Sequence, residues 1–292
     1  MISIIGIVIV LGAIAGGYMM EHGKFAVLMQ PAELVIIFGA AIGTLVVANP
    51  VPTLMKIISG LAGVLKGSPF TKAFYLDTLK MMYELFTLSR KAGMAKLEEE
   101  VDNPDKGQVI NKYPKFLKDH HAVHFLCDTL RMAISGGVDP LDIDTMMEAD
   151  LEVHHKESSE PIAALATMAD ALPGLGIVAA VLGVVLTMGA LGGPKEAIGE
   201  KVAAALVGTF LGILLCYGIF GPLATAMGKN VEAESVYFGV LRMGATGFVK
   251  EMSPIMAVEL ARRAIPSAVR PTFQEMEGAC RGGGGVAAAK AA

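Results

Sequence analysis

Histidine is the residue type whose spacing first suggests chemistry in this chain. His120 and His124 lie one helical turn apart, and His154 and His155 follow later. A zinc protease needs a glutamate directly after the first histidine of such a pair, but His121 occupies that position. We therefore expect polar histidines on helix surfaces and no metal site.

Other residue patterns of enzymes are also missing from the sequence. It contains no Gly-x-Ser-x-Gly turn, no phosphate-binding glycine loop that ends in lysine, and no closely spaced pair of cysteines. The three cysteines, Cys127, Cys216 and Cys280, are far apart in the chain. The sequence therefore predicts a protein that is not an enzyme and that holds no cofactor.

Hydroxyl groups in apolar stretches suggest a different chemistry, the passage of ions through a membrane. These hydroxyl groups belong to Thr44, Thr187, Thr209 and Tyr217. Proton relays need a titratable group inside the membrane, and no charged residue or histidine accompanies these hydroxyls. A conducting protein would thus need a partner that brings a carboxylate. Threonines in helices also bond their own backbone, so the sequence leaves the role of Thr209 open.

Four long stretches of the chain contain no charge, and three of them hold these hydroxyl groups. The four stretches are residues 1–20, 34–55, 171–194 and 202–228. Each is long enough for the roughly 20 apolar residues with which a helix crosses a bilayer core. Since 53% of all residues are hydrophobic, we predict an all-α integral membrane protein with four transmembrane helices and a large helical domain between the second and third.

These spans divide the chain into two hairpins and two long polar segments. We expect a transmembrane hairpin in 1–49 (spans 1–20 and 32–49), a cytoplasmic helical domain in 50–170, a second hairpin in 171–228 (spans 172–193 and 202–227), and a cytoplasmic C-terminal helix with a disordered, Gly-rich tail in 229–292.

The distribution of basic residues predicts the orientation of the spans. Of the 24 Lys and Arg, only Lys24, Lys195 and Lys201 lie in the short connections within the hairpins. The positive-inside rule therefore places both long segments and both termini in the cytoplasm. The segment between the hairpins holds more acidic than basic residues, so a protein partner is expected and nucleic acid is not.

Helical periodicity predicts the elements of the cytoplasmic segment. Tyr75, Leu79, Met82 and Phe86 share one face at helical spacing, and Gly93 should end that helix. Shorter helices are predicted at 97–101 and 122–135, and another should start after Asp139-Pro140, with the aspartate as its cap.

Two prolines lie near the predicted cytoplasmic edge of the second hairpin. Pro173 fits the first turn of a helix, where its missing N–H has no cost. Pro222 lies within a span that continues to Met227, so it frees a backbone carbonyl and kinks the helix. The pair fits a hinge or a purely structural kink, and the sequence alone leaves both open.

Four segments are specific enough to indicate a family: 30–37, 89–98, 172–180 and 205–215. Together they resemble the MotA/PomA family of bacterial flagellar stator subunits, which is related to TolQ and ExbB, and the similarity extends to about Glu277. It implies a homo-oligomeric ring of five copies in the lipid of the inner membrane, around two copies of a MotB-like single-span subunit that supplies an aspartate. Proton flow would then drive the ring against the rotor protein FliG.

The resemblance also implies roles for individual residues. Arg90 and Glu98 would face the rotor, Pro173 and Pro222 would couple ion passage to movement, and Thr209 would line the channel. The lining would extend to Ala180, Thr187 and Tyr217. Sodium-driven relatives carry a threonine where this chain has Ala180, so protons are expected. The run Glu98-Glu99-Glu100 offers more than one acid to the rotor.

Two other functions compete with this interpretation. An ExbB/TolQ-type energiser of outer-membrane processes would resemble the last two spans, but such proteins have three spans and begin outside, unlike the predicted first hairpin. A non-conducting membrane scaffold would show the same spans, and only a conductance or motility measurement separates it from a channel.

Overall fold

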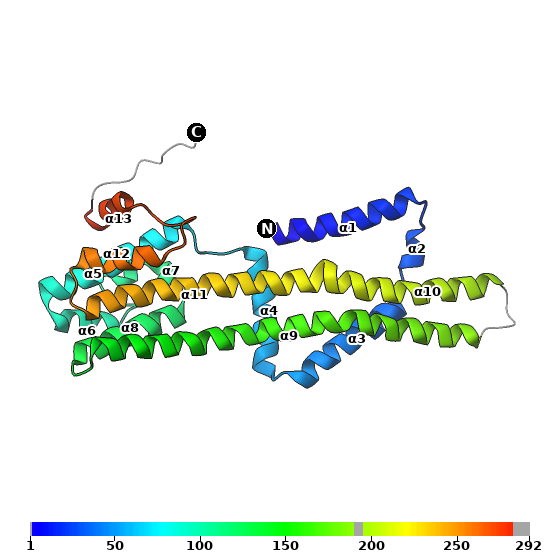
Figure 1. Ribbon diagram of the computed structural model, residues 1–292, viewed down its shortest axis with the longest axis horizontal. Coiled ribbons are helices and arrows are strands. Elements are labelled where there is room, and N and C mark those ends of the chain that lie inside the picture. Colours follow the sequence, from blue (N-terminus) through cyan, green and yellow to red (C-terminus); the bar gives the residue numbers. More distant parts are fainter. Residues whose placement is uncertain (1, 190–194, 283–292) are drawn as a thin grey trace. The chain divides into compact units, whose positions relative to one another are not determined.

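The computed structural model describes residues 2–189 and 195–282, so residues 283–292 of the predicted tail lie outside the described residues. The predicted all-α architecture is confirmed (Figure 1). In chain order the helices are α1 (Ile2–Met20), α2 (Phe25–Leu28), α3 (Pro31–Ala48), α4 (Val51–Lys66), α5 (Lys72–Ala92), α6 (Met94–Asp102), the 3₁₀-helix η1 (Ile110–Lys112), α7 (Pro114–Leu117), α8 (His120–Ser135), α9 (Pro140–Met188), α10 (Lys195–Leu214), the π-helix η2 (Leu215–Phe220), α11 (Gly221–Val249), α12 (Pro254–Ala264) and α13 (Phe273–Cys280).

Four helical segments are long and apolar enough to cross a membrane, by length and composition. They are Ser3–Met20, Phe25–Ala48, Pro140–Met188 and Lys201–Val249. The third is one helix, α9, which continues through Pro161 and Pro173. Pro173 therefore lies inside a helix and not in its first turn, where the sequence analysis placed it as one possibility.

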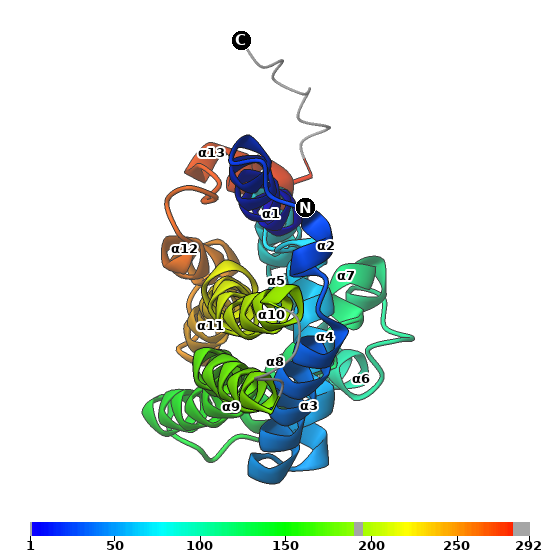
Figure 2. The same cartoon turned by 90° about the vertical axis from the view of Figure 1, so that its right-hand side faces the viewer.

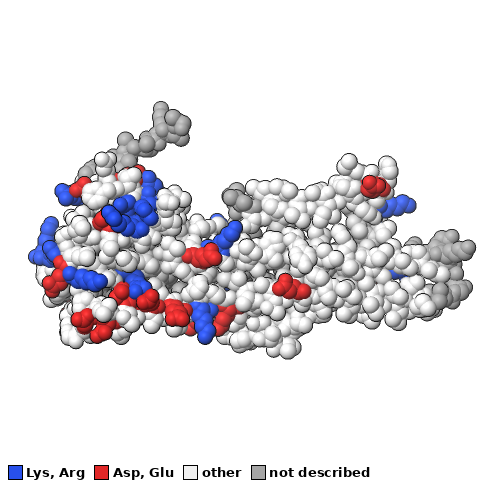
Figure 3. Space-filling model, viewed as in Figure 1, with Lys and Arg blue, Asp and Glu red and all other residues white. Residues whose placement is uncertain are grey.

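The chain forms two compact units, and α9 and α11 contribute residues to both. Unit 1 comprises Met1–Ser68 and Lys156–Val231, and unit 2 comprises Pro69–His155 and Glu232–Ala292. On the face drawn in Figure 3, charged side chains of both signs are interspersed over unit 2 and sparse over unit 1. The predicted membrane boundaries at residues 49, 171 and 228 remain predictions.

In unit 1, small residues bring α9 and α10 close together (Figures 1 and 2). A Cβ placed on Gly212 of α10 would lie 2.5 Å from the Leu172 carbonyl oxygen and 3.0 Å from Cα of Gly176 on α9. Farther along the pair, a Cβ on Gly183 would lie 2.9 Å from the Cβ of Ala205. Such backbone approach is the usual packing of helices in lipid, where apolar surface alone gives no drive to associate.

The apolar helix α1 has little cover inside the chain. None of its apolar window Ser3–Met20 is buried, and large side chains such as Val8 and Ile9 are more than half exposed. Such a helix needs lipid or other helices around it.

Unit 2 holds a soluble-type core centred on α5. The predicted face of Tyr75, Leu79, Met82 and Phe86 is fully buried, which confirms the periodicity. Gly93 follows the helix with a φ of +90°, a conformation that favours glycine. The predicted cap is also present, because Asp139 Oδ1 accepts a 2.8 Å hydrogen bond from the Leu141 N–H at the start of α9.

A buried carboxylate fixes α6 to the segment that follows it. Glu100, 3% exposed, accepts three backbone hydrogen bonds of 2.7 Å, from the N–H groups of Gln108, Val109 and Ile110. The backbone of Gly107 passes close to this carboxylate, and a Cβ on Gly107 would clash with Glu100 Oε1. Arg131 of α8 holds the same C-terminal end of α6, through Asp102 and the Val101 carbonyl. The orientation of α6 therefore depends on Glu100.

We predict that Glu100→Ala lowers the free energy of unfolding of unit 2 by about 3 kcal/mol, because it leaves buried N–H groups without an acceptor. Thermal unfolding and protease resistance of the purified full chain in detergent would measure this. Glu99→Ala is the matched control, since Glu99 is exposed and pairs only with Lys96 at 2.6 Å; it should cost under about 1 kcal/mol. Equal losses in the two variants would contradict the anchoring role.

Candidate functional site

The predicted channel residues lie in unit 1, on α9, α10 and η2. Ala180 on α9 is half-buried, and Thr187 is buried with its hydroxyl donating to the Gly183 carbonyl at 2.8 Å. Thr187 thus bonds its own helix, as does Thr44, which donates to the Ala41 carbonyl at 2.9 Å. Both hydroxyls thus make the backbone hydrogen bond that is common for threonine in a helix, and the predicted channel role of Thr187 stays a prediction.

Thr209 and Tyr217 are the hydroxyls that remain available. Thr209 is half-buried on α10, and its hydroxyl forms no hydrogen bond with any residue that the structure describes. Tyr217 is 72% exposed in η2. The place of both hydroxyls in a channel lining stays a prediction.

Glu33 is an ionisable residue in unit 1. It served in the sequence analysis only as the boundary of an apolar stretch. It lies in the first turn of α3, which begins at Pro31, and is 6% exposed. Its Oε2 lies 2.6 Å from where a Cβ on Gly208 would be, and it has no hydrogen-bond partner within the described chain. Proline at a first helical position was the signal that would have placed Glu33 inside the helix.

Burial of an unpaired carboxyl in a membrane unit is costly, so such a residue points to function. The residue next to Gly208 is Thr209, and a Cβ on Gly208 would also lie 3.3 Å from the Cβ of Ala179, the neighbour of Ala180. Glu33 thus packs behind the positions predicted to line the channel.

The second proline joint takes an unexpected form. The six residues Leu215–Phe220 before Gly221 and Pro222 form a π-helix, in which the Gly221 N–H donates to the Cys216 carbonyl five residues back. Pro222 has no N–H to offer the Gly218 carbonyl, and the wider π turn accommodates the break. The kink predicted at Pro222 is therefore a π-helical segment, of a kind that often marks functional sites.

The predicted rotor residues lie in unit 2, apart from the channel residues. Arg90, in the last turn of α5, donates from Nη2 to the carbonyls of Glu251 and Met252, at 2.9 and 3.1 Å. Glu98 on α6 is exposed and has no ion-pair partner among residues 2–189 and 195–282. No hydrogen bond or ion pair joins these two side chains within those ranges.

The structure sorts the three consecutive glutamates of α6. Glu100 is buried as an anchor, Glu99 pairs with Lys96, and Glu98 remains exposed and unpaired among the described residues. Glu98 is therefore the acid of this run that is available to a partner.

In unit 2, α9 and α11 are tied together by a bidentate ion pair. The Arg242 guanidinium donates to both oxygens of Asp144, at 2.9 and 3.0 Å, and the Thr246 hydroxyl adds a third hydrogen bond at 2.8 Å. The hydrogen bond from Arg242 lowers the pKa of the Asp144 carboxyl below its usual range. The ion pair between Asp144 and Arg242 therefore stabilises the fold above the ordinary pKa of aspartate, and this stabilisation is lost as the pH falls through the lowered pKa.

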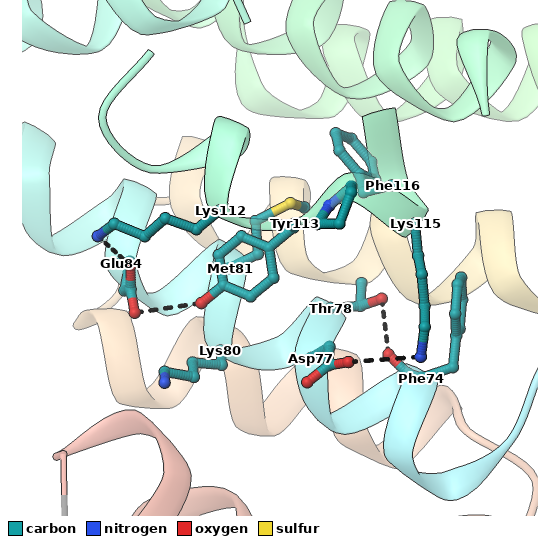
Figure 4. A pocket seen from close by; sticks show the side chains of 11 residues that line it. Phe74, Asp77, Thr78, Lys80, Met81, Glu84, Lys112, Tyr113, Lys115 and Phe116 are labelled. Carbon is teal, nitrogen blue, oxygen red and sulfur yellow. Dashed lines mark hydrogen bonds and ion pairs between the residues drawn. The ribbon is translucent and has the colours of Figure 1, made fainter. Parts of the chain in front are cut away.

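A cavity of about 360 Å³ lies between α5 and the η1–α7 segment (Figure 4). Lys112 pairs with Glu84 at 3.1 Å, and the Tyr113 hydroxyl donates to the other oxygen of Glu84 at 3.1 Å. Lys115 and Asp77 form a wider pair at 3.9 Å. The two acids that line the cavity, Glu84 and Asp77, are thus each paired with a lysine. Among the described residues, no group of three or more His, Cys, Asp or Glu could hold a metal ion.

Comparison with known protein families gives two matches along the chain. Residues 4–93 match the family model "Motility protein A N-terminal". Residues 118–238 match the "MotA/TolQ/ExbB proton channel family". The second match covers α8 to most of α11, which includes every predicted channel and coupling residue.

Relatives of known identity match nearly the whole chain. Motility protein A of Escherichia coli (strain K12) is 38% identical over 277 residues, which are 95% of this chain and 94% of the relative. Chemotaxis protein LafT of Vibrio parahaemolyticus is 33% identical over 273 residues, 94% of this chain and 96% of the relative. One relative is named as a motility protein and the other as a chemotaxis protein, and the matched family is one of proton channels and not of enzymes.

Solved structures share the fold. MotAB of C. jejuni matches with a TM-score of 0.74 at 19% identity, covering 91% of this chain and 95% of that chain. The flagellar MotAB stator complex of Bacillus subtilis matches with a TM-score of 0.70 at 21% identity, covering 94% and 98%. The chain therefore belongs to the MotA/TolQ/ExbB proton channel family and, within it, to the motility protein A group of multi-pass inner-membrane proteins of the flagellar stator.

Proposed function

We propose that this protein forms a proton channel with a MotB-like single-span subunit and couples proton flow to rotation against the rotor protein FliG. One observation carries the proposal: α9 and α10 bring the hydroxyl of Thr209 together with small residues, and the stretches 171–194 and 202–228 that carry them contain no ionisable group. A proton relay needs such a group, so the partner supplies it. The complexes solved for two relatives, both titled as MotAB, support a partner of this kind.

Several copies surround that partner in this proposal, with five as the expected number and with both termini of each copy in the cytoplasm. The nearly uncovered α1 and the exposed Tyr217 support an oligomer, because they offer apolar and amphipathic surface that a single copy leaves bare. Ala180, half-buried beside the path, carries a methyl group where a sodium ion would profit from an oxygen ligand, so protons are the proposed ions.

Movement would pass along the helices that leave the channel. Pro173 within α9 and Pro222 after the π-helix interrupt the backbone hydrogen-bond ladder, and such interruptions allow a helix to bend. Both helices contribute residues to unit 2, where Arg90 and Glu98 act at the contact with FliG. The exposed, unpaired state of Glu98 supports this assignment.

Restoration of swimming in a stator-deficient strain tests the function and the ion together. We predict that the chain, expressed with its MotB-like partner, restores swimming in sodium-free medium, and that a protonophore abolishes it because the proton gradient drives rotation. Swimming that required sodium and resisted the protonophore would contradict proton coupling. No restoration despite normal membrane levels of both proteins would favour the non-conducting scaffold.

Charge reversal at Glu98 tests the rotor contact. We predict that Glu98→Lys abolishes swimming at normal membrane levels, because it places like charges in contact, and that a compensating charge reversal on the rotor restores swimming. Glu99→Lys serves as the control on the same helix and should retain swimming, since Glu99 already pairs with Lys96. A loss in Glu98→Lys that no rotor substitution relieves would argue against a direct contact.

The buried carboxyl of Glu33 lies in the first turn of α3 and packs against Gly208, beside the proposed path. We predict that Glu33→Gln, which keeps the shape but cannot exchange a proton, lowers swimming speed severalfold at normal membrane levels. Glu21→Gln, an exposed residue near the same end of the hairpin, should leave speed unchanged. If Glu33→Gln swims like the parent, the side chain only packs against Gly208.

A further inference from the structure

The helix α4 (Val51–Lys66) presents an apolar stripe that stays exposed in the chain. At 100° per residue, one face of the helix carries Val51, Met55, Ile58 and Leu65, whose exposed fractions are 71, 63, 64 and 42%. Ala62, also exposed, lies on the same face. A contiguous apolar surface of this kind marks an interaction site.

The opposite face of α4 is packed inside unit 1. Ile57 and Val64 are buried, and they belong to the same apolar cluster as Met168 of α9. On α11, the end of Met227 lies so close to Gly60 that a Cβ on this glycine would clash with it. These contacts fix which face of α4 is left exposed.

α4 runs across the long helices of unit 1 and not along them. Figure 1 shows it crossing the unit-1 part of α9, and Figure 2, which looks along α9, shows it from the side. Only Asn49 and Pro50 separate α4 from α3, and Val47 in the last turn of α3 is 90% exposed. The apolar surface of a candidate span therefore continues onto α4, at the end of that span. A helix in this position lies along the membrane surface, as interfacial amphipathic helices do.

The charge of this part of the chain is purely basic. Residues 34–76 contain Lys56, Lys66 and Lys72 and no acidic residue. Lys66 is exposed and forms no ion pair with any residue that the structure describes, and Lys56 meets Glu157 only at 3.9 Å, which makes a weak surface pair. At 100° per residue, Lys56 and Lys66 lie on the same flank of the stripe, from which long side chains can extend to the level of lipid headgroups.

We propose that α4 forms a binding site for anionic phospholipids, in which the exposed stripe contacts acyl chains and the ammonium groups of Lys56 and Lys66 bind headgroup phosphates. Lipid is the occupant because the stripe continues the exposed apolar surface of α3 and because its basic flank complements an anionic leaflet. In the proposed orientation this is the cytoplasmic leaflet. The site requires neither the proposed ion nor the rotor contact, and it would fix the depth of unit 1 in the membrane.

Tryptophan fluorescence tests whether lipid covers the stripe. The chain contains no tryptophan, so a single introduced one reports only on its own surroundings. The probe is Met55→Trp in the full chain, reconstituted into phosphatidylcholine vesicles that contain lipid with brominated acyl chains, which quench tryptophan on contact. We expect quenching at least about twofold stronger in Met55→Trp, and in Ile58→Trp as a second probe, than in the control Phe273→Trp. Phe273 is also exposed and apolar but lies in unit 2. Equal quenching at these positions would overturn the proposal and favour a cover made of protein, such as a second copy.

A comparison of two brominated lipids tests the lysines. Met55→Trp is measured with brominated phosphatidylglycerol or brominated phosphatidylcholine at the same fraction in unlabelled phosphatidylcholine. The anionic lipid should be preferred by about fivefold or more, which is roughly the contribution of one lysine near a membrane surface. Adding Lys56→Gln and Lys66→Gln should remove the preference. Adding Lys91→Gln and Lys118→Gln, at two exposed lysines of unit 2, removes as much charge and should keep it. No preference in Met55→Trp, or one that survives the loss of Lys56 and Lys66, would overturn the site.

Discussion

The cost of placing a charge in hydrocarbon governs this structure. Helices that pass through lipid must form all their backbone hydrogen bonds internally. They contain ionisable groups only where the function requires them. Residues 171–194 and 202–228 comply, for they contain hydroxyls, methyl groups and glycines but no charge. The close approach of Gly176 and Gly212 follows from the same constraint, because packing and not water holds these helices together. A proton path beside them needs a carboxylate from another chain.

The same constraint explains where the charged and polar side chains of the protein lie. Outside the predicted spans the buried Glu100 accepts from three N–H donors, and the half-buried Asp144 accepts from Arg242 and Thr246. These contacts give unit 2 a fixed internal geometry. Glu33 differs from both, because one oxygen of its buried carboxyl has no hydrogen-bond partner among the described residues, and it lies next to the proposed path.

Periodicity and charge were sufficient to predict what depends on local sequence. The four apolar helices, the buried face of α5, the glycine after it and the aspartate cap of α9 all follow from spacing and residue type. The continuity of α9 through Pro173 could not be predicted, since it depends on neighbours that hold the helix where the ladder is broken. The π-helix before Pro222 could not be predicted either, because the way a helix accommodates a proline also depends on its neighbours.

Side-chain roles that depend on distant partners also escaped the sequence. Glu98, Glu99 and Glu100 are equivalent by type, and only the segment at 107–110 shows which of them is buried. The hydrogen bonds of Arg90 could not be predicted, because their acceptors are backbone carbonyls more than 160 residues away in the chain. Glu33 served in the sequence analysis only as the limit of the charge-free stretch 34–55, whereas in the structure it packs against Gly208 on another helix.

Proton flux into liposomes tests the central claim, that this chain offers a path without its own mid-membrane titratable group, most directly. Vesicles would contain the purified chain alone, the complex with its MotB-like partner, or the complex with the partner's membrane aspartate changed to asparagine. Under a potassium-diffusion potential, we expect proton flux only in vesicles that contain the intact complex. Flux through the chain by itself, or through the complex without the partner's carboxyl, would contradict the claim.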